Sequence, residues 1–218
     1  MDARVVVVTG ADRGIGAAIV TRLANRGDIA ILGGTSVTAG ERSARVLVRH
    51  LDVTHRSCAD ELAEELRGRF GRVDGLINTA TVHYDTWQRA LDADLLTVQE
   101  AINTNLIGAW RTIQALLPLL LASGTGRIVN VSSVLGSLTA MGAGTPAYRV
   151  STASLNALTR LLAAELQGTG ILVNAVCTSC GTDEQSIAAG ATGVLWALDL
   201  PPDGPTGGLF REGQQLSW

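Results

Sequence analysis

The sequence carries little net charge and has no long uninterrupted apolar run. Its 218 residues have a formal net charge of -3 at pH 7, which gives no reason to expect nucleic acid or an anionic membrane as a partner. The longest apolar stretch, 113–122, is too short to span a bilayer and contains Pro118. No signal peptide is visible, because Met1 and Asp2 lead directly into a predicted strand. We therefore expect a cytoplasmic protein that does not enter a membrane.

Cysteine is also scarce. The three cysteines, Cys58, Cys177 and Cys180, do not make the disulfide framework of a small secreted domain. Cys177 and Cys180 have the C-x-x-C spacing of a redox pair or of half a zinc site, but the sequence has no second pair to complete such a site. A thioredoxin-like motif would open a helix after an early strand, whereas this pair follows a late one. We expect no metal, and two thiols that line a pocket.

Apolar residues are plentiful enough for a sizeable core. Hydrophobic residues make up 46% of the chain, and the mean hydropathy of +0.25 argues against disorder. The length suits one domain over residues 1–218, and no repeat or linker interrupts it.

The N-terminal segment combines a strand, a glycine turn and a helix. Four consecutive valines, 5–8, are typical of a parallel strand that is buried on both faces. Gly10, Gly14 and Gly16 follow, and an apolar stripe with helical spacing begins at Ile15. Gly10 permits a tight turn, Gly14 lets a ligand approach the backbone, and Gly16 lets the helix pack on the strand. The helix N-terminus would present free N–H groups to a phosphate, although a glycine-rich turn without a ligand has the same pattern.

The run Thr-Gly-x-x-x-Gly-Ile-Gly at residues 9–16 resembles the short-chain dehydrogenase/reductase (SDR) family. The resemblance extends nearly to the C-terminus and implies an α/β fold: a single Rossmann-like, doubly wound parallel sheet with helices on both faces. Strands are expected near 28–33, 46–53, 73–80, 126–133, 171–176 and the C-terminus, and helices over 56–70, 93–122 and 146–167.

The resemblance also implies a catalytic set of Tyr148, Ser133 and Asn105. In the family, Tyr donates a proton to a carbonyl oxygen as hydride arrives, Ser polarises that oxygen, and Asn bends its helix and holds a proton-relay water. Ser133 precedes Tyr148 by 15 residues rather than the common 13, which implies a slightly longer loop.

The cofactor set implied by the resemblance starts with the glycine turn and its neighbours. Asp52 is expected to meet the adenine amino group, and Arg13 to face a 2′-phosphate; a solvated loop charge is the alternative for Arg13. The second strand ends in Gly33 and Gly34 and offers neither an acid, which would favour NAD, nor an arginine, which would favour NADP; because of Arg13 we favour NADP(H). The full set is Gly10, Arg13, Gly14, Ile15, Gly16, Asp52, Val53, Asn78 and Ala80.

Several positions depart from the family pattern, and they gather at the nicotinamide end. The family has Lys four residues after Tyr, where it lowers the Tyr pKa and binds the nicotinamide ribose; this chain has Thr152. Thr79 and Thr81 replace Asn and Gly of an Asn-Asn-Ala-Gly motif, so Thr81 adds a side chain in a crowded place. Thr178 and Ser179 replace Pro-Gly before a short substrate lid.

These departures leave the reaction open. The first hypothesis is a non-redox proton transfer on a small carbonyl compound (cyclisation, dehydration or isomerisation) that uses Tyr148 and Ser133, with NADP(H) structural only or absent. The alternative is an NADPH-dependent ketoreductase with weakened acid catalysis. A pseudoenzyme that serves only as an oligomer partner is a third possibility.

Aromatic residues amount to only 4% of the chain, so few rings are available to recognise a planar ligand. In the family, the segment after the fourth strand borders the substrate site. We therefore expect Tyr84 and Trp87, together with Cys180, at the substrate, although a loop with packed aromatics has the same composition. The resemblance implies a homodimer or homotetramer built on the helices over 93–122 and 146–167. Leucine-rich faces such as Leu155, Leu158 and Leu162 agree with this, although a buried core face has the same pattern.

Overall fold

A computed structural model describes residues 3–178, 181 and 183–218. Over these residues the strands form one nine-stranded sheet in the order β3-β4-β2-β1-β5-β6-β7-β8-β9. The inner strands, β4-β2-β1-β5-β6-β7-β8, run parallel to one another. At the two edges, β3 pairs antiparallel with β4, and β9 pairs antiparallel with β8. The strand order reverses at β1, which pairs with β2 on one side and β5 on the other. Ligands of doubly wound sheets bind outside the carboxyl ends of the strands at such a point.

The strands are β1 (Val5–Thr9), β2 (Ile29–Gly34), β3 (Gly40–Ser43), β4 (Val46–His50), β5 (Gly75–Asn78), β6 (Arg127–Ser132), β7 (Leu172–Cys177), β8 (Leu209–Arg211) and β9 (Gln214–Leu216). The helices are α1 (Gly14–Asn25), α2 (Arg56–Phe70), α3 (Leu95–Ala101), the π-helix η1 (Ile102–Gly108), α4 (Ala109–Ser123), the short 3-10 helix η2 (Val134–Gly136), α5 (Pro146–Glu165) and α6 (Glu184–Leu198).

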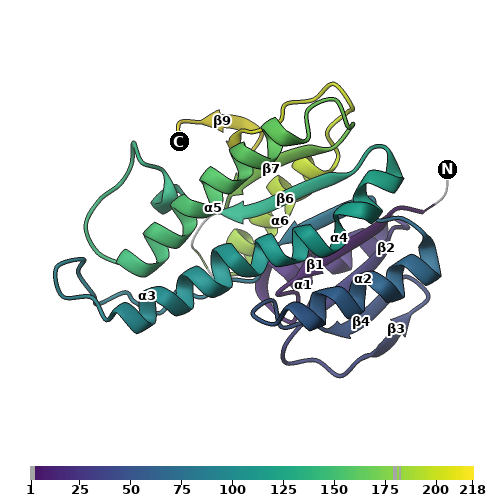
Figure 1. The fold of residues 1–218 in the computed structure, drawn as a ribbon, viewed down its shortest axis with the longest axis horizontal. Helices are drawn as coiled ribbons and strands as arrows, with labels where there is room; N and C mark the ends of the chain where they lie inside the picture. The colour runs from purple at the N-terminus through teal and green to yellow at the C-terminus, as the bar shows by residue number, and fades with distance from the viewer. Residues whose placement is uncertain (1–2, 179–180, 182) are drawn as a thin grey trace.

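Helices cover both faces of the sheet, with α2, α4 and α5 on one face and α1 and α6 on the other (Figure 1). The valines of β1 show why the sequence forms this arrangement. Val5 and Val7 belong to the core on the α2–α4–α5 side, whereas Val6 and Val8 belong to the core on the α1–α6 side. A continuous apolar strand therefore has both of its faces covered, as a parallel sheet requires. The predicted doubly wound α/β fold is confirmed.

Some elements differ from their predicted positions. The third predicted strand, 46–53, ends at His50, so Asp52 and Val53 lie in the following loop. The edge strand β3 and the helix α6 were not predicted. All four residues of β3 are exposed, and α6 buries a face that includes Gly190, Ala191 and Gly193. The polar strand β3 lacks the apolar alternation on which a strand prediction depends, whereas α6 was missed although its buried residues Ala191, Val194 and Leu198 recur at helical spacing.

The predicted helix over 93–122 is a run of α3, η1 and α4 with a π-helical middle. This run, Leu95–Ser123, is long and apolar enough by length and composition to cross a membrane, and it is the one such helix among the described residues. Ile113, Leu116 and Leu120 of α4 lie in the core, and α4 packs along α2. These contacts are those of a core helix in a folded domain.

The leucine-rich face of α5 also belongs to the core. Leu155, Leu158 and Leu162 are 4%, 3% and 7% exposed, so they pack inside the subunit rather than on a surface available to a second copy. Apolar residues that remain exposed on this side include Ile107, Trp110 and Leu161.

Candidate active site

Three glycines shape the turn between β1 and α1: Gly10 and Gly16 allow close packing, and Gly14 leaves open space. Gly10 has φ +59°, and a Cβ there would lie 2.6 Å from the Cα of Ala80. A Cβ on Gly16 would lie 2.7 Å from the carbonyl oxygen of Gly10. These two glycines allow the turn, the helix and the loop after β5 to pack closely. Gly14 has φ +57°, but no atom lies within 4 Å of its would-be Cβ, so this glycine faces open space.

The N-terminus of α1 provides donors beside that open space. The N-cap residue is Arg13, and it makes no side-chain capping bond to the helix. The first N–H groups of a helix without such a cap remain available, and the helix dipole favours an anion at this end. The backbone of the turn thus suits a diphosphate, as the sequence predicts.

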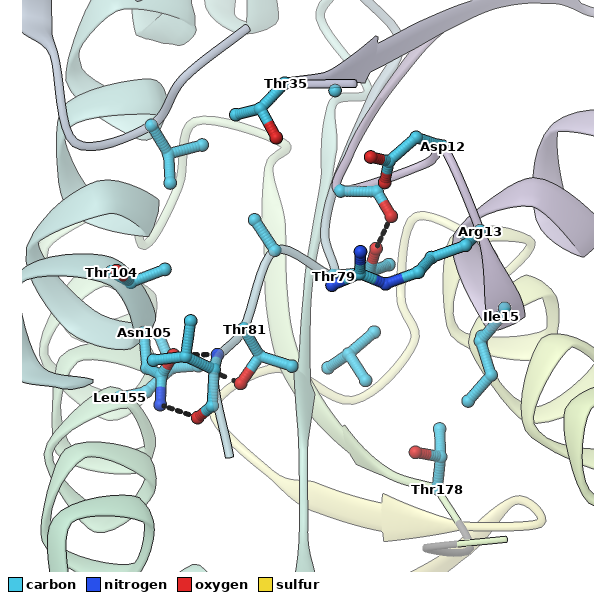
Figure 2. Close-up of a pocket in the computed structure, with 18 of the residues that line it drawn as sticks. Asp12, Arg13, Ile15, Thr35, Thr79, Thr81, Thr104, Asn105, Leu155 and Thr178 are labelled. Carbon is cyan, nitrogen blue, oxygen red and sulfur yellow. Dashed lines mark hydrogen bonds between the residues drawn. The ribbon is translucent and has the colours of Figure 1, made fainter. Parts of the chain in front are cut away.

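A cleft of about 700 Å³ extends from this turn to the first residues of α5. Figure 2 shows Arg13 and Ile15 on one side of it, Asn105 and Thr81 on the other, and Thr178 at the end of β7. The predicted residues that line the cleft are Gly10, Arg13, Gly14, Ile15, Gly16, Asp52, Val53, Ala80, Asn105 and Tyr148. The phosphate cradle and the expected proton donor therefore share one cavity.

Asp12 and Thr35 also line the cleft, and neither has a sequence signal of its own. Asp12 lies in the turn after β1, and Thr35 directly follows β2 (Figure 2). A Cβ on Gly34 would lie 3.0 Å from the Cβ of Asp12, which shows how closely these two ends approach. Further lining residues are Thr54, Thr79, Thr104, Thr152, Leu155 and Ile187.

Asp52 reaches the cleft with its carboxylate already engaged. The backbone N–H and hydroxyl of Thr54 donate to its Oδ1 at 2.9 and 2.6 Å, and His55 Nδ1 lies 3.2 Å from Oδ2. The hydrogen bonds from Thr54, assisted by His55, lower the pKa of Asp52 below its ordinary value. The carboxylate is thus held ionised at the adenine end of the cleft.

Asn78 is not among the described residues that line the cleft. It is 4% exposed and donates through Nδ2 to Asn130 Oδ1 at 2.9 Å, and Asn130 donates in turn to Thr159 Oγ1. The side chain therefore links β5, β6 and α5 inside the core, and contact with a cofactor stays a prediction. The neighbouring Thr79 donates its hydroxyl to the carbonyl oxygen of Thr9, which ties the loop after β5 to the glycine turn.

Tyr148 lies in the first turn of α5, whose start is unusual. Thr145 at the N-cap has φ +46° and provides no capping bond, and Pro146 is the first helical residue. The cap comes from Asp85, a residue of the loop after β5 that is 1% exposed. Its Oδ2 accepts the N–H groups of Ala147 at 2.7 Å and Tyr148 at 3.4 Å. The sequence offered no signal for this contact between distant segments.

The two serines at the end of β6 have different environments. Ser132 Oγ donates to Asn156 Oδ1 on α5 at 2.6 Å, a structural contact in the core. Ser133 is 1% exposed, and its Oγ accepts the N–H of Leu135 at 3.2 Å, which caps η2. Ser132 rather than Ser133 is among the residues that line the cleft. The assignment of Ser133 to catalysis stays a prediction.

Asn105 uses all four hydrogen-bonding positions of its amide. Oδ1 accepts from Val82 N at 2.8 Å and from Thr81 Oγ1 at 3.1 Å. Nδ2 donates to Val82 O at 3.1 Å and to Ser151 Oγ at 2.9 Å. The side chain thus fastens the loop after β5 to α5 from the middle of η1, and π-helical segments are frequent where a helix serves a site. Thr81 is an exposed partner in this clamp and lines the cleft.

Tyr84 and Trp87, two of the three predicted substrate residues, are not among the described residues that line the cleft. Tyr84 is 45% exposed, and its hydroxyl donates to Glu100 Oε2 at 3.1 Å. Burial and the Glu100 carboxylate raise the pKa of this phenol. Trp87 is 75% exposed, and Cys180 lies outside the described residues. Within the described part of the chain, no group of three His, Cys, Asp or Glu side chains could hold a metal ion.

Comparison with known proteins decides the family. The short chain dehydrogenase family model matches residues 4–186. The chain belongs to this family. It is 38% identical over 186 residues to a Streptomyces violaceoruber protein named as ketoacyl reductase 2 of the granaticin polyketide synthase, covering 80% of this chain and 72% of that one. It is 33% identical over 182 residues to 3-oxoacyl-(acyl-carrier-protein) reductase of Escherichia coli, with coverage of 80% and 72%.

Solved structures agree on the fold of this short-chain dehydrogenase. A short-chain dehydrogenase from Streptomyces avermitilis superposes with a TM-score of 0.83 at 26% identity, covering 97% of this chain and 89% of the other. The NADPH-bound carbonyl reductase from chicken fatty liver superposes with a TM-score of 0.87 at 23% identity, covering 100% and 96%. The names of the sequence relatives describe oxidoreductases, which favours the reductive hypothesis over non-redox proton transfer.

Proposed function

We propose that the chain is an NADPH-dependent reductase of ketones carried by small molecules such as 3-oxoacyl thioesters. The observation that carries the proposal is the single cleft that joins the phosphate cradle at Gly14 to Tyr148 and Asn105. The ketoacyl reductases among the relatives support the substrate class. Arg13 lines the cleft and supports NADPH over NADH, because its guanidinium could pair with a 2′-phosphate.

The residues would divide the reaction as follows. The glycine turn and the N-terminus of α1 hold the diphosphate, and Asp52 meets the adenine. A nicotinamide cofactor held in this way would supply the hydride for the carbonyl carbon. Tyr148 gives its proton to the carbonyl oxygen, which Ser133 polarises, and Asn105 holds the loop and helix that form this end of the cleft.

The test follows the absorbance of the reduced nicotinamide with a 3-oxoacyl thioester as substrate. Tyr148→Phe is expected to lower the rate by about 10²–10⁴-fold, the usual contribution of a general acid. The chain has two tyrosines, so Tyr84→Phe is a matched control that keeps the rate. Substrate-dependent oxidation of NADPH supports the proposal. Product formation without any nicotinamide refutes it.

That second outcome would establish the non-redox reaction as the function. Thr152 is the observation in its favour, because this residue lines the cleft at the position where the family carries Lys. A ring that no longer docks there would leave Tyr148 and Ser133 to move protons on a carbonyl compound without hydride transfer.

We also propose that the protein is a cytoplasmic homodimer or homotetramer. The exposed apolar side chains of Ile107 and Trp110 on the η1–α4 run, and of Val150 and Leu161 on α5, support an interface on these helices. Sedimentation of the wild type and of Trp110→Arg tests it: a monomeric wild type would refute the proposal, and dissociation of the variant would support it.

A further inference from the structure

The amine that the family places beside Tyr is missing from the whole chain. The sequence contains no lysine, and its 17 basic residues are all arginines. Thr152 lies one turn after Tyr148 on α5 and is 3% exposed. Arg149 is directed elsewhere, because its Nε donates to Gly144 O at 2.9 Å and its guanidinium reaches Ala143 O at 3.3 Å. No lysine from any segment can therefore supply the charge.

An imidazole lies against the phenol instead. The ring of His83 stacks on the ring of Tyr148 with 4.0 Å between centroids and 17° between planes. His83 is exposed, so its ring can exchange protons with solvent. Histidine is the side chain whose charge ordinarily changes between about pH 5 and 8. A protonated imidazole in this position would be a cation over the face of an aromatic ring.

The stack is held by a four-residue strap, 82–85, that is fastened at both ends. Val82 exchanges two hydrogen bonds with the amide of Asn105, at 2.8 and 3.1 Å. Asp85 accepts the N–H of Ala147 at 2.7 Å, one residue before Tyr148. Because the strap is bound to the helix that carries the phenol, His83 keeps a fixed position relative to it.

We propose that His83 is a positioning residue that, when protonated, supplies over the phenol of Tyr148 the positive charge that Thr152 cannot supply. The inference rests on the proposed reductase function. In the proton transfer, the O–H bond of the phenol breaks and a new O–H bond forms on the substrate oxygen as hydride reaches the carbonyl carbon. The phenolate left behind is stabilised by the imidazolium and regains its proton from solvent, while His83 keeps its own.

The charged side chains around this stack are engaged in other contacts. The Asp85 carboxylate is bound by amides of α5, and Glu100 on α3 accepts the hydroxyl of Tyr84. Arg149 on α5 is bound to loop carbonyls. His83 is the titratable group in ring contact with Tyr148 in the described structure.

The first test compares pH profiles of kcat/KM for ketone reduction. An exposed cation–π contact corresponds to a change of roughly 2- to 5-fold. We expect the wild-type rate to fall by about that factor as pH rises from 5 to 8. His83→Gln should lose this step, and His50→Gln, which changes an exposed histidine at the end of β4, should retain it. His83→Arg should keep the higher rate at pH 8. A His83→Gln profile that retains the step, or a His83→Arg rate no higher than that of His83→Gln at pH 8, would overturn the inference.

A second readout needs no activity. The chain has three histidines, so their ring protons can be resolved by NMR. The Tyr148 ring should shift the His83 signals upfield, and Tyr148→Leu should remove that shift whereas Tyr84→Leu should not. A wild-type His83 signal without the shift would overturn the inference whatever the activity. If no ketone is reduced, the proposed function and the role of His83 fall together; if reduction occurs without the pH step, the inference alone falls.

Discussion

Introducing the missing amine by Thr152→Lys tests what limits the reaction. The methyl group of Thr152 lies on the Gly136 side, where a Cβ on Gly136 would be 2.6 Å away, so that side has no room for a longer chain. The residue also lines the cleft. A lysine side chain must therefore extend into the cleft, towards the phenol one turn earlier on α5.

The expected gain follows from Coulomb's law. With an effective dielectric constant of about 20, an ammonium about 5 Å from a phenolate oxygen stabilises it by about 3 kcal/mol. That corresponds to roughly 10²-fold in rate, from which the cost of desolvating the ammonium is subtracted. We expect kcat for NADPH-dependent reduction to rise by about 10- to 100-fold. The single lysine of the variant can be observed individually, because the wild type has none.

The matched control is Thr152→Met, which adds a similar stem without charge. An equal gain in Thr152→Met would refute the electrostatic reasoning. The reasoning would also be refuted if Thr152→Lys folds and binds NADPH as the wild type does but shows no increase in kcat. A double-mutant cycle with His83→Gln adds a second condition. If both cations act on one phenolate, the loss caused by His83→Gln should shrink in the Thr152→Lys background.

Three further predictions concern the rest of the cleft. Gly10→Ala and Gly14→Ala both place an alanine at a similar positive φ angle, but only at Gly10 does the new Cβ meet backbone atoms. Gly10→Ala should therefore lower the free energy of unfolding in urea by about 2–3 kcal/mol more than Gly14→Ala, whereas Gly14→Ala should chiefly weaken NADPH binding. Equal losses of unfolding free energy in the two variants would contradict this. Asn105→Asp can still accept the two hydrogen bonds of Oδ1 but loses both bonds that Nδ2 donates. It should lower the free energy of unfolding by about 2–3 kcal/mol. A change within about 0.5 kcal/mol would contradict the role of Asn105 in fastening the loop to α5. The pKa of Asp52 is lower in the folded protein, so its carboxylate stabilises the fold above its ordinary pKa of about 3.9, and this stabilisation is lost as the pH falls through the lower folded value. In Asp52→Asn the free energy of unfolding should therefore depend less on pH in that range. An unchanged pH dependence would contradict this.

Local patterns in the sequence were sufficient for much of the fold and part of the site. The valine run, the glycine turn and the amphipathic helix α2 each have a periodicity that one short window reveals. Asn105 was placed by the family resemblance, and the structure shows a π-helix around it. The edge strand β3 could not be predicted, because its polar residues form no apolar pattern.

The contacts that set the geometry of Tyr148 could not be predicted in this way. Asp85 and Ala147 are 62 residues apart in the chain, and neither sits in a recognisable capping sequence. The stack of His83 on Tyr148 likewise depends on how the loop after β5 lies on α5. Such contacts are consequences of tertiary packing, and local windows carry no information about them.

The contacts at the two ends of the cleft differ, and the difference favours an active enzyme over a pseudoenzyme. At the phosphate end, Gly10 is enforced by backbone contact with Ala80, so that end tolerates little change. At the Tyr148 end, the substituted side chain of Thr81 donates to Asn105 Oδ1, whereas Thr79 donates to Thr9 O beside the glycine turn. Loss of activity alone would give no reason for Thr81 to join the network that fastens the loop after β5 to α5. A cleft rebuilt around the phenol, with an imidazole over its ring, is the expected result if proton donation was kept while the amine was lost.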